Sequence, residues 1–254
     1  MERKEDVSMA YQNGPAKEGP YGPLRRDIIE LRLKPGMTIS IKALYTYYDS
    51  SRSPMRDALL RLEQEGLVML LPQRGIMISR IDLKRAEEER FLRVSVEREV
   101  MKIFMRQHNQ ADIDNLEDSL QEQEKCISTR NLRAFLDADD DFHNKFYCAV
   151  NKFWCAKTID SVSGHYRRFR LLSIIKQSIC KEILSQHREM VEAIKKDDEQ
   201  KLMALFNHHL TKMEKEGPEF LHKFPDLFQD MEGKQFDSLN LDFLASLVTN
   251  SKSE

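Results

Sequence analysis

The spacing of apolar residues near the start of the chain first follows a helical period and then a strand-like one. Three short helices are predicted, over residues 24–33, 41–48 and 54–65. Two strands are predicted after them, over residues 67–71 and 76–79. Gly66 suits the end of the third helix, and the Pro72-Gln73-Arg74-Gly75 turn joins the strands as a hairpin. Three helices and a hairpin in this order outline a winged helix-turn-helix.

From residue 83 to about residue 214 the pattern changes to long amphipathic stretches with few breakers. Six helices are predicted, over residues 83–107, 111–128, 131–150, 155–178, 179–196 and 199–215. Their short connections predict an antiparallel all-α bundle. The expected fold is therefore mainly α, with an N-terminal winged helix-turn-helix and a two-stranded hairpin followed by this bundle.

The same pattern divides the chain into four parts. They are a flexible polar tail over residues 1–20, a winged helix-turn-helix over residues 21–82, a helical domain over residues 83–216, and a C-terminal extension over residues 217–254. The extension contains Phe220, Phe224, Phe228 and Phe236, so it either docks on the bundle or folds on a partner. Its role stays open.

Composition narrows the function classes. No run approaches the ~18 apolar residues that span a bilayer, and the N-terminus lacks a secretory apolar core, so a cytoplasmic protein is expected. The four cysteines form no C-x-x-C pair and are expected to be reduced, buried thiols. The net charge of −2 argues at first against nucleic acid. However, residues 21–82 carry ten basic and seven acidic side chains, so a charge of +3 there is hidden by −5 elsewhere.

The third predicted helix carries a candidate DNA-reading surface. Ser51 and Ser53, with Pro54 in the first turn, mark a helix N-terminus whose free N–H groups favour phosphate. Arg52 and Arg56 are four residues apart and share a face, which suits guanine edges in the major groove or the neighbouring phosphates.

If these two arginines stood alone, an ordinary solvated helix face would be the better explanation of them. The hairpin that follows changes this balance, because Arg74 at its tip, beside Gly75, can enter the adjacent minor groove or hold the backbone. The candidate DNA-binding residues are Ser51, Arg52, Ser53, Arg56, Arg74 and Gly75.

A second candidate site lies in the helical region. Asp139 and His143 are four residues apart on a face with apolar neighbours, and His187 and His209 lie on the apolar stripes of two later helices. One carboxylate and three imidazoles suit a divalent metal such as Zn, Ni, Mn or Fe. The alternative is that the histidines are hydrogen-bonded core residues and that Asp139 pairs with a basic side chain.

The N-terminal motifs resemble the DNA-binding domain of GntR-family bacterial transcription regulators. The matching stretches are Pro35-Gly36, Arg52-Ser53-Pro54-Met55-Arg56-Asp57-Ala58-Leu59, Glu65-Gly66-Leu67-Val68 and Pro72-Gln73-Arg74-Gly75. The match spans residues 24–82 and departs from the usual pattern at Ile41, Tyr45, Asp49 and Asp57. The resemblance implies that the arginines at positions 52 and 56 contact DNA and that the wing tip reaches the minor groove.

The helical region resembles FCD, the ligand-binding domain of the FadR-like branch of that family. The matching residues are Asp139-x-x-Phe142-His143, Asn151, Gln186-His187-Arg188, Ala193-Ile194 and His209-Leu210. The resemblance implies that Asp139, His143, His187 and His209 hold a metal whose open positions take a carboxylate metabolite. Arg93, in an Arg93-x-x-x-Glu97 match, is the expected partner of that carboxylate.

The leading hypothesis is a homodimeric repressor that reads a palindromic double-stranded operator and senses a small carboxylate at the metal. Two alternatives stay open from the sequence. One is a metal-dependent hydrolase, because open metal positions can activate water. The other is a DNA-binding protein whose metal only ties helices together.

Overall fold

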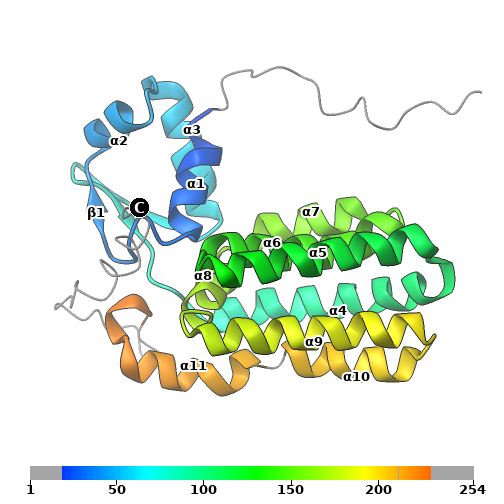
Figure 1. Cartoon of the computed structure of the whole chain (residues 1–254). Coiled ribbons are helices and arrows are strands. Elements are labelled where there is room, and N and C mark those ends of the chain that lie inside the picture. The colour runs from blue at the N-terminus through cyan, green and yellow to red at the C-terminus, as the bar shows by residue number, and fades with distance from the viewer. Residues whose placement is uncertain (1–18, 211, 230–254) are drawn as a thin grey trace, which may run out of the picture.

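The computed structural model describes residues 19–210 and 212–229. Its N-terminal domain consists of α1 (Tyr21–Ile29), β1 (Thr38–Ile39), α2 (Ile41–Tyr47), α3 (Arg52–Gln64), β2 (Val68–Leu71) and β3 (Gly75–Ile78). The helices pack on the sheet around a core that includes Leu24, Leu44, Met55, Leu62 and Ile76. This is the predicted winged helix-turn-helix (Figure 1).

The wing has three strands, so the prediction of a two-stranded hairpin was incomplete. The sheet order is β1-β3-β2, and β1 pairs antiparallel with β3, with Thr38 opposite Met77. A strand of two residues shows no alternation in sequence, which is why the pattern missed it. The pairing explains Gly75: its φ is +116°, and a Cβ there would lie 2.1 Å from the carbonyl oxygen of Ile39.

The first helix also ends earlier than predicted, at Ile29 rather than at residue 33. Leu31 adopts a positive φ of 57°, which stops the helix. Its side chain is buried and belongs to a core cluster of the helical bundle. The end of α1 is therefore shaped by contact with the second domain, which local periodicity cannot show.

The helical domain begins where Asp82 caps α4 by accepting hydrogen bonds from the N–H groups of Lys84 and Arg85. Its helices are α4 (Leu83–Gln107), α5 (Gln110–Ser128), α6 (Leu132–Ala149), α7 (Phe153–Val162), α8 (Gly164–Ser173), α9 (Gln177–Lys195), α10 (Glu199–Leu210) and α11 (Lys212–Lys223). Phe104, Phe142 and Phe146 are fully buried between them, and each contributes roughly 1.5–3 kcal/mol by leaving water. The winged domain sits at one end of this bundle (Figure 1).

One of the six predicted helices is divided. The stretch 155–178 breaks at Ser163 into α7 and α8. At the break, a Cβ on Gly164 would lie 2.7 Å from a methyl carbon of Leu67, so glycine lets α8 approach the winged domain closely. The predicted helix 199–215 corresponds to α10 and the first turn of α11, on either side of residue 211, which lies outside the described residues.

The described part of the C-terminal extension docks on the bundle. After α11, a 3₁₀ turn, η2 (Pro225–Leu227), leads to Phe228. Leu227 and Phe228 are buried in the same core cluster as Ile81. Phe236 and most of the expected N-terminal tail lie outside the described residues.

Two further expectations concern thiols and membranes. Cys126 and Cys180 are buried, but Cys155 is half-buried and Cys148 is exposed, so the expectation that all four thiols are buried was wrong for Cys148 and only partly right for Cys155. Position 148 lies on the outer face of α6, which the helical pattern alone did not assign. Within the described ranges, no helix is long and apolar enough to cross a membrane.

Candidate metal centre and DNA-reading surface

Four buried side chains meet in the middle of the bundle. Asp139 and His143 come from α6, His187 from α9 and His209 from α10. One potential ligand atom from each lies within 4.8 Å of the others. Helical spacing places the first two on one face, and packing of α9 and α10 brings the two remaining imidazoles to it.

Each imidazole is oriented by a second side chain. His187 Nδ1 lies 2.8 Å from Gln123 Oε1, and His209 Nδ1 lies 2.8 Å from Gln186 Oε1. His143 Nδ1 contacts the carboxylate of Glu97 in the same way. An Nδ1–H that donates to an oxygen leaves the Nε2 lone pair available, and metal-binding histidines are usually held like this.

Within the part of the chain that the structure describes, the Nε2 atoms of the three imidazoles have no hydrogen-bonding neighbour except one another. His187 Nε2 and His209 Nε2 face each other at 3.4 Å, so two lone pairs would be opposed. His143 Nε2 is buried and has no hydrogen-bond partner among the described residues. Because a buried unpaired acceptor costs roughly 1–3 kcal/mol, these atoms call for a cation between them.

The charge states also suit a metal. Burial lowers the pKa of His187 to about 3, and burial together with the other two imidazoles lowers the pKa of His209 well below its usual value. Burial would raise the pKa of Asp139, but the Arg170 guanidinium and the nearby imidazoles hold it far below its usual value. Neutral imidazoles and an ionised carboxylate are the forms that bind metal.

Asp139 also forms an ion pair with a basic side chain, which was the alternative expectation for this residue. Arg170 of α8 donates to Asp139 Oδ2. The second oxygen, Oδ1, lies 3.7 Å from His187 Nε2. One carboxylate oxygen thus pairs with arginine while the other faces the imidazoles, so the four residues fit a divalent ion with three nitrogen ligands and one oxygen ligand.

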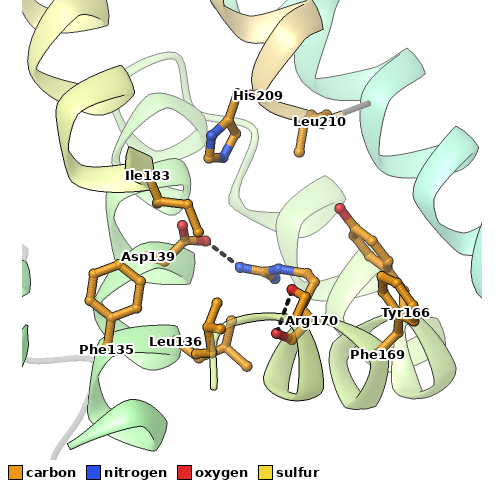
Figure 2. Close-up of a pocket in the computed structure, with 11 residues that line it drawn as sticks. Phe135, Leu136, Asp139, Tyr166, Phe169, Arg170, Ile183, His209 and Leu210 are labelled. Carbon is orange, nitrogen blue, oxygen red and sulfur yellow. Dashed lines mark hydrogen bonds and ion pairs between the residues drawn. The ribbon is translucent and has the colours of Figure 1, made fainter. Parts of the chain in front are cut away.

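Two cavities flank this cluster, and Arg170 lines both. The first, about 40 Å³ in volume, is walled mainly by apolar side chains, including Phe135 and Phe169. Figure 2 shows Asp139 and Arg170 pointing toward each other in it, with His209 nearby. The second, about 50 Å³ in volume, is lined mostly by polar residues, including Arg93 and His143.

Three arginines gather around Asp140 in the wall of the polar cavity, which Glu97 and Asp160 also line. Arg93 is buried and pairs with Glu97 at 3.1 Å and with Asp140 at 3.3 Å. Arg167 and Arg170 also donate to Asp140. The sequence identified Arg93 alone. The two other arginines are three residues apart, a spacing that places them near each other on α8, but they lay inside a stretch predicted as one continuous helix.

The predicted DNA-reading residues lie together on the winged domain. Arg52, Ser53 and Arg56 are exposed in the first turns of α3, and Ser51 occupies its N-cap position. Arg74 is exposed at the wing tip. None of the three arginines forms an ion pair with another described residue, so their guanidinium groups are available. Gly75 is buried, and the β1 contact accounts for it without DNA.

Both regions match known families. Residues 18–78 match the bacterial regulatory proteins of the gntR family, and residues 90–212 match the FCD domain. A transcriptional regulator of Streptomyces ambofaciens is 30% identical over 191 residues, which are 75% of this chain and 80% of that protein. The chain belongs to the GntR family. It is a DNA-binding transcription regulator and not an enzyme, because the family and its relatives are regulators, which removes the hydrolase alternative.

Other relatives of this GntR-family regulator agree. The transcriptional repressor RspR of Escherichia coli is 26% identical over 216 residues, which are 85% of this chain and 95% of RspR. Escherichia coli McbR/YncC has the same fold, with a TM-score of 0.64 and 17% identity over 80% of this chain and 95% of that one. A GntR regulator from a Rhodococcus species matches with a TM-score of 0.64 and 19% identity over 80% and 96%.

The junction between the regulator's two domains is built by α8. His165 accepts a hydrogen bond at Nδ1 from the N–H of Asp82, at 2.9 Å, and its Nε2 lies 3.2 Å from the carbonyl oxygen of Gly66. Arg168, fully buried, donates to the carbonyl oxygen of Ser79 at 2.6 Å. These contacts join α8 to the end of α3 and to the segment after the wing. The helix that holds Arg170 at the candidate metal centre thus also holds the winged domain.

Proposed function

We propose that this GntR-family regulator is a homodimeric repressor whose affinity for a palindromic operator is set by a small carboxylate bound at a divalent metal. The observation that carries the proposal is the buried Nε2 of His143, which has no partner among the described residues and faces two other imidazoles. Zn, Ni, Mn and Fe all accept such nitrogen and oxygen ligands.

In this proposal Asp139, His143, His187 and His209 hold the metal. The bound metal supplies a Lewis-acidic centre that attracts a carboxylate oxygen. Glu97, Gln123 and Gln186 orient the three imidazoles through their Nδ1 atoms.

The polar cavity is the proposed position of the effector. Arg93, Arg167 and Arg170 face it from α4 and α8, and arginine recognises carboxylates through two parallel hydrogen bonds. The acidic side chain that these arginines share, Asp140, is only partly buried. An incoming carboxylate would compete with Asp140 for the guanidinium groups.

The proposed link to DNA runs through α8. A carboxylate that accepts hydrogen bonds from Arg167 or Arg170 would change the contacts that these side chains make with α6. His165 and Arg168 of the same helix contact the winged domain and the segment after it. An effector alters operator affinity only if its own affinity differs between two orientations of the winged domain. Movement of α8 would supply that difference.

A homodimer is supported by exposed apolar side chains on two neighbouring helices. Phe91 and Leu92 on α4 are 67% and 40% exposed, and Phe153 and Trp154 on α7 are 64% and 67% exposed. Exposed apolar patches of this kind commonly mark protein interfaces. Two winged domains brought together in this way would read two half-sites.

The experiment that tests the function is operator binding with a panel of small carboxylates. Binding of metal-loaded protein to its own promoter region is measured at fixed salt, with and without each acid. The proposal expects at least one acid to weaken binding and to raise the melting temperature of the protein. Equal operator affinity with every acid, in protein that contains metal, would instead support a purely structural metal.

A further inference from the structure

The polar cavity beside the candidate metal centre contains a tyrosine whose hydroxyl group has no structural role in the described contacts. Tyr147 lines this cavity from α6 and is only 2% exposed. Its ring packs in the apolar core cluster that includes Phe142 and Phe146. Its hydroxyl is buried and has no hydrogen-bond partner among the described residues. A buried hydroxyl that is left unpaired costs free energy, so phenylalanine would serve better if packing were the only requirement.

Two tyrosines of the winged domain show how such a hydroxyl is usually satisfied. Tyr48 donates to Asp27 Oδ2 at 2.7 Å, and Tyr21 donates to a carboxylate oxygen of Glu65. Within the described ranges, Tyr147 has no acceptor of this kind. Its hydroxyl is therefore available to a molecule in the cavity.

The unpaired hydroxyl lies close to the proposed metal ligands. Three buried side-chain atoms lack a hydrogen-bond partner among the described residues, and two of them, on His143 and Tyr147, belong to residues that line the polar cavity. The third, on Glu30, is in an ion pair with Arg32. Tyr147 follows His143 by one turn of α6, so the two side chains project from the same helix face, about 5–6 Å apart at their Cβ atoms. A ligand that reaches both needs two polar groups separated by a few atoms.

The surrounding charges favour a neutral group at the tyrosine. Burial raises the pKa of Tyr147, and the negative charge of Glu97 raises it further, so the hydroxyl stays protonated and can donate. A second carboxylate at this point would be repelled by Glu97. A hydroxyl group of the ligand would accept from Tyr147 and could also donate to a carboxylate of the cavity wall, such as Glu97 or Asp140.

The cavity also limits the size of the ligand. Its volume is about 50 Å³. One water-sized group needs about 10–15 Å³, so the cavity holds roughly four such groups. A small acid of about five or six non-hydrogen atoms therefore fits better than a long-chain or aromatic acid.

We propose that the effector is a small hydroxy acid and that Tyr147 recognises its hydroxyl group. This inference rests on the proposed function and adds a specificity-determining residue to it. The metal and the three arginines of the polar cavity attract the carboxylate of any small acid, so they do not discriminate between such acids. Tyr147 does, because a ligand without the hydroxyl leaves a buried donor unpaired.

Titration calorimetry with matched acids tests the proposal on the metal-loaded full chain. The pairs are glycolate against propanoate, and 3-hydroxypropanoate against butanoate. Within each pair the acids have equal numbers of non-hydrogen atoms, and a hydroxyl in one replaces a methyl in the other. Wild-type protein is expected to bind the hydroxy acid at least about tenfold more tightly in one or both pairs. In Tyr147→Phe the two acids of each pair should bind within about twofold of each other, with unchanged metal content.

Thermal unfolding of the ligand-free proteins separates recognition from a structural role. Tyr147→Phe is expected to melt at the wild-type temperature or above, because it removes an unpaired buried hydroxyl. Tyr48→Phe is the matched control. It removes the hydrogen bond to Asp27, so it should melt at a lower temperature while it keeps the wild-type preference for hydroxy acids.

Three results would overturn the proposal. They are equal affinities within both pairs in the wild type, a preference that survives in Tyr147→Phe, and a loss of thermal stability in Tyr147→Phe as large as that in Tyr48→Phe. The proposed function would stand in each of these cases, because acids would still bind. If none of the four acids bound to metal-loaded wild-type protein, both the recognition by Tyr147 and the proposed carboxylate sensor would be contradicted.

Discussion

Arg170 on α8 donates to the buried carboxylate of Asp139 on α6, so the helix that joins the two domains is tied directly to the candidate metal centre. The carboxylate faces Arg170 with one oxygen and His187 with the other. Asp139 therefore has two sources of positive charge, an arginine and the proposed metal. Removing one should make the protein depend on the other.

The first prediction concerns Arg170→Ala. In metal-free protein this change leaves a buried carboxylate without its partner, so the free energy of unfolding should fall by about 3–5 kcal/mol. Added Zn or Ni should restore more stability to the variant than it adds to the wild type, as measured by urea unfolding. Arg188→Ala is the control, because its pair with Glu124 is exposed and contributes about 0–1 kcal/mol. Equal losses with and without metal would count against a metal beside Asp139.

The second prediction concerns Gln123→Leu on α5. The wild-type side chain is buried and faces His187 Nδ1, so its loss should release the imidazole from its fixed orientation. Metal affinity should fall by about 10–100-fold, as measured by titration calorimetry. Gln121→Leu is the matched control, because that residue is exposed on the same helix. An unchanged affinity in the Gln123 variant would show that His187 does not bind the metal.

The third prediction concerns pH and the domain junction. Burial and the charge of Arg168 lower the pKa of His165 to about 3. Between about pH 6.5 and pH 3 the unfolded chain therefore binds a proton that the folded chain does not, and stability should fall as the pH decreases through this window. A proton on Nδ1 would face the N–H of Asp82 and the guanidinium of Arg168.

His165→Asn removes this titration. The free energy of unfolding of the variant should depend less on pH than that of the wild type between pH 4 and pH 6.5. The variant must be compared with the wild type because the lowered pKa values of His187 and His209 contribute a pH dependence of the same sign to both proteins. His208→Asn, a change to an exposed histidine, should keep the wild-type slope. An equal slope in the His165 variant would contradict the assignment.

The fourth prediction concerns the DNA-reading surface. Arg52→Ala and Arg56→Ala should each weaken operator binding by about 1–3 kcal/mol, and loss of a phosphate contact should also reduce the salt dependence. Fluorescence anisotropy with the protein's own promoter region measures both quantities. Arg106→Ala, an exposed change on α4, should leave binding unchanged. Wild-type operator affinity in both the Arg52→Ala and the Arg56→Ala variant would show that other residues contact the DNA.

Local patterns predicted most of the elements, and they selected four residues that the structure brings together in one buried cluster. A spacing of four residues identified Asp139 and His143 as a pair, and the apolar stripes correctly assigned His209, not His208, to the interior. The exposed arginines of α3 followed from the helix N-terminus that Ser51 and Pro54 marked. These features depend on residues within one or two helical turns, which is the range that periodicity reports.

Contacts between distant segments could not be predicted in this way. The short strand β1, the early end of α1 at Ile29 and the break before Gly164 all depend on packing against another part of the chain. The same is true of the Arg170 contact with Asp139, since α6 and α8 are separated by a whole helix in sequence. Glycine at position 164 was the available signal for the break, but its reason lies in Leu67 of the other domain.

The most direct test of the central claim is the metal content of the full chain. Elemental analysis of freshly purified wild-type protein, or of protein after incubation with Zn or Ni and removal of the excess, should give about one equivalent per chain. His143→Ala combined with His187→Ala should remove it, whereas His208→Ala should retain it. A wild-type protein that holds far less than about one equivalent, and takes up none when Zn or Ni is added, would contradict the proposed metal centre.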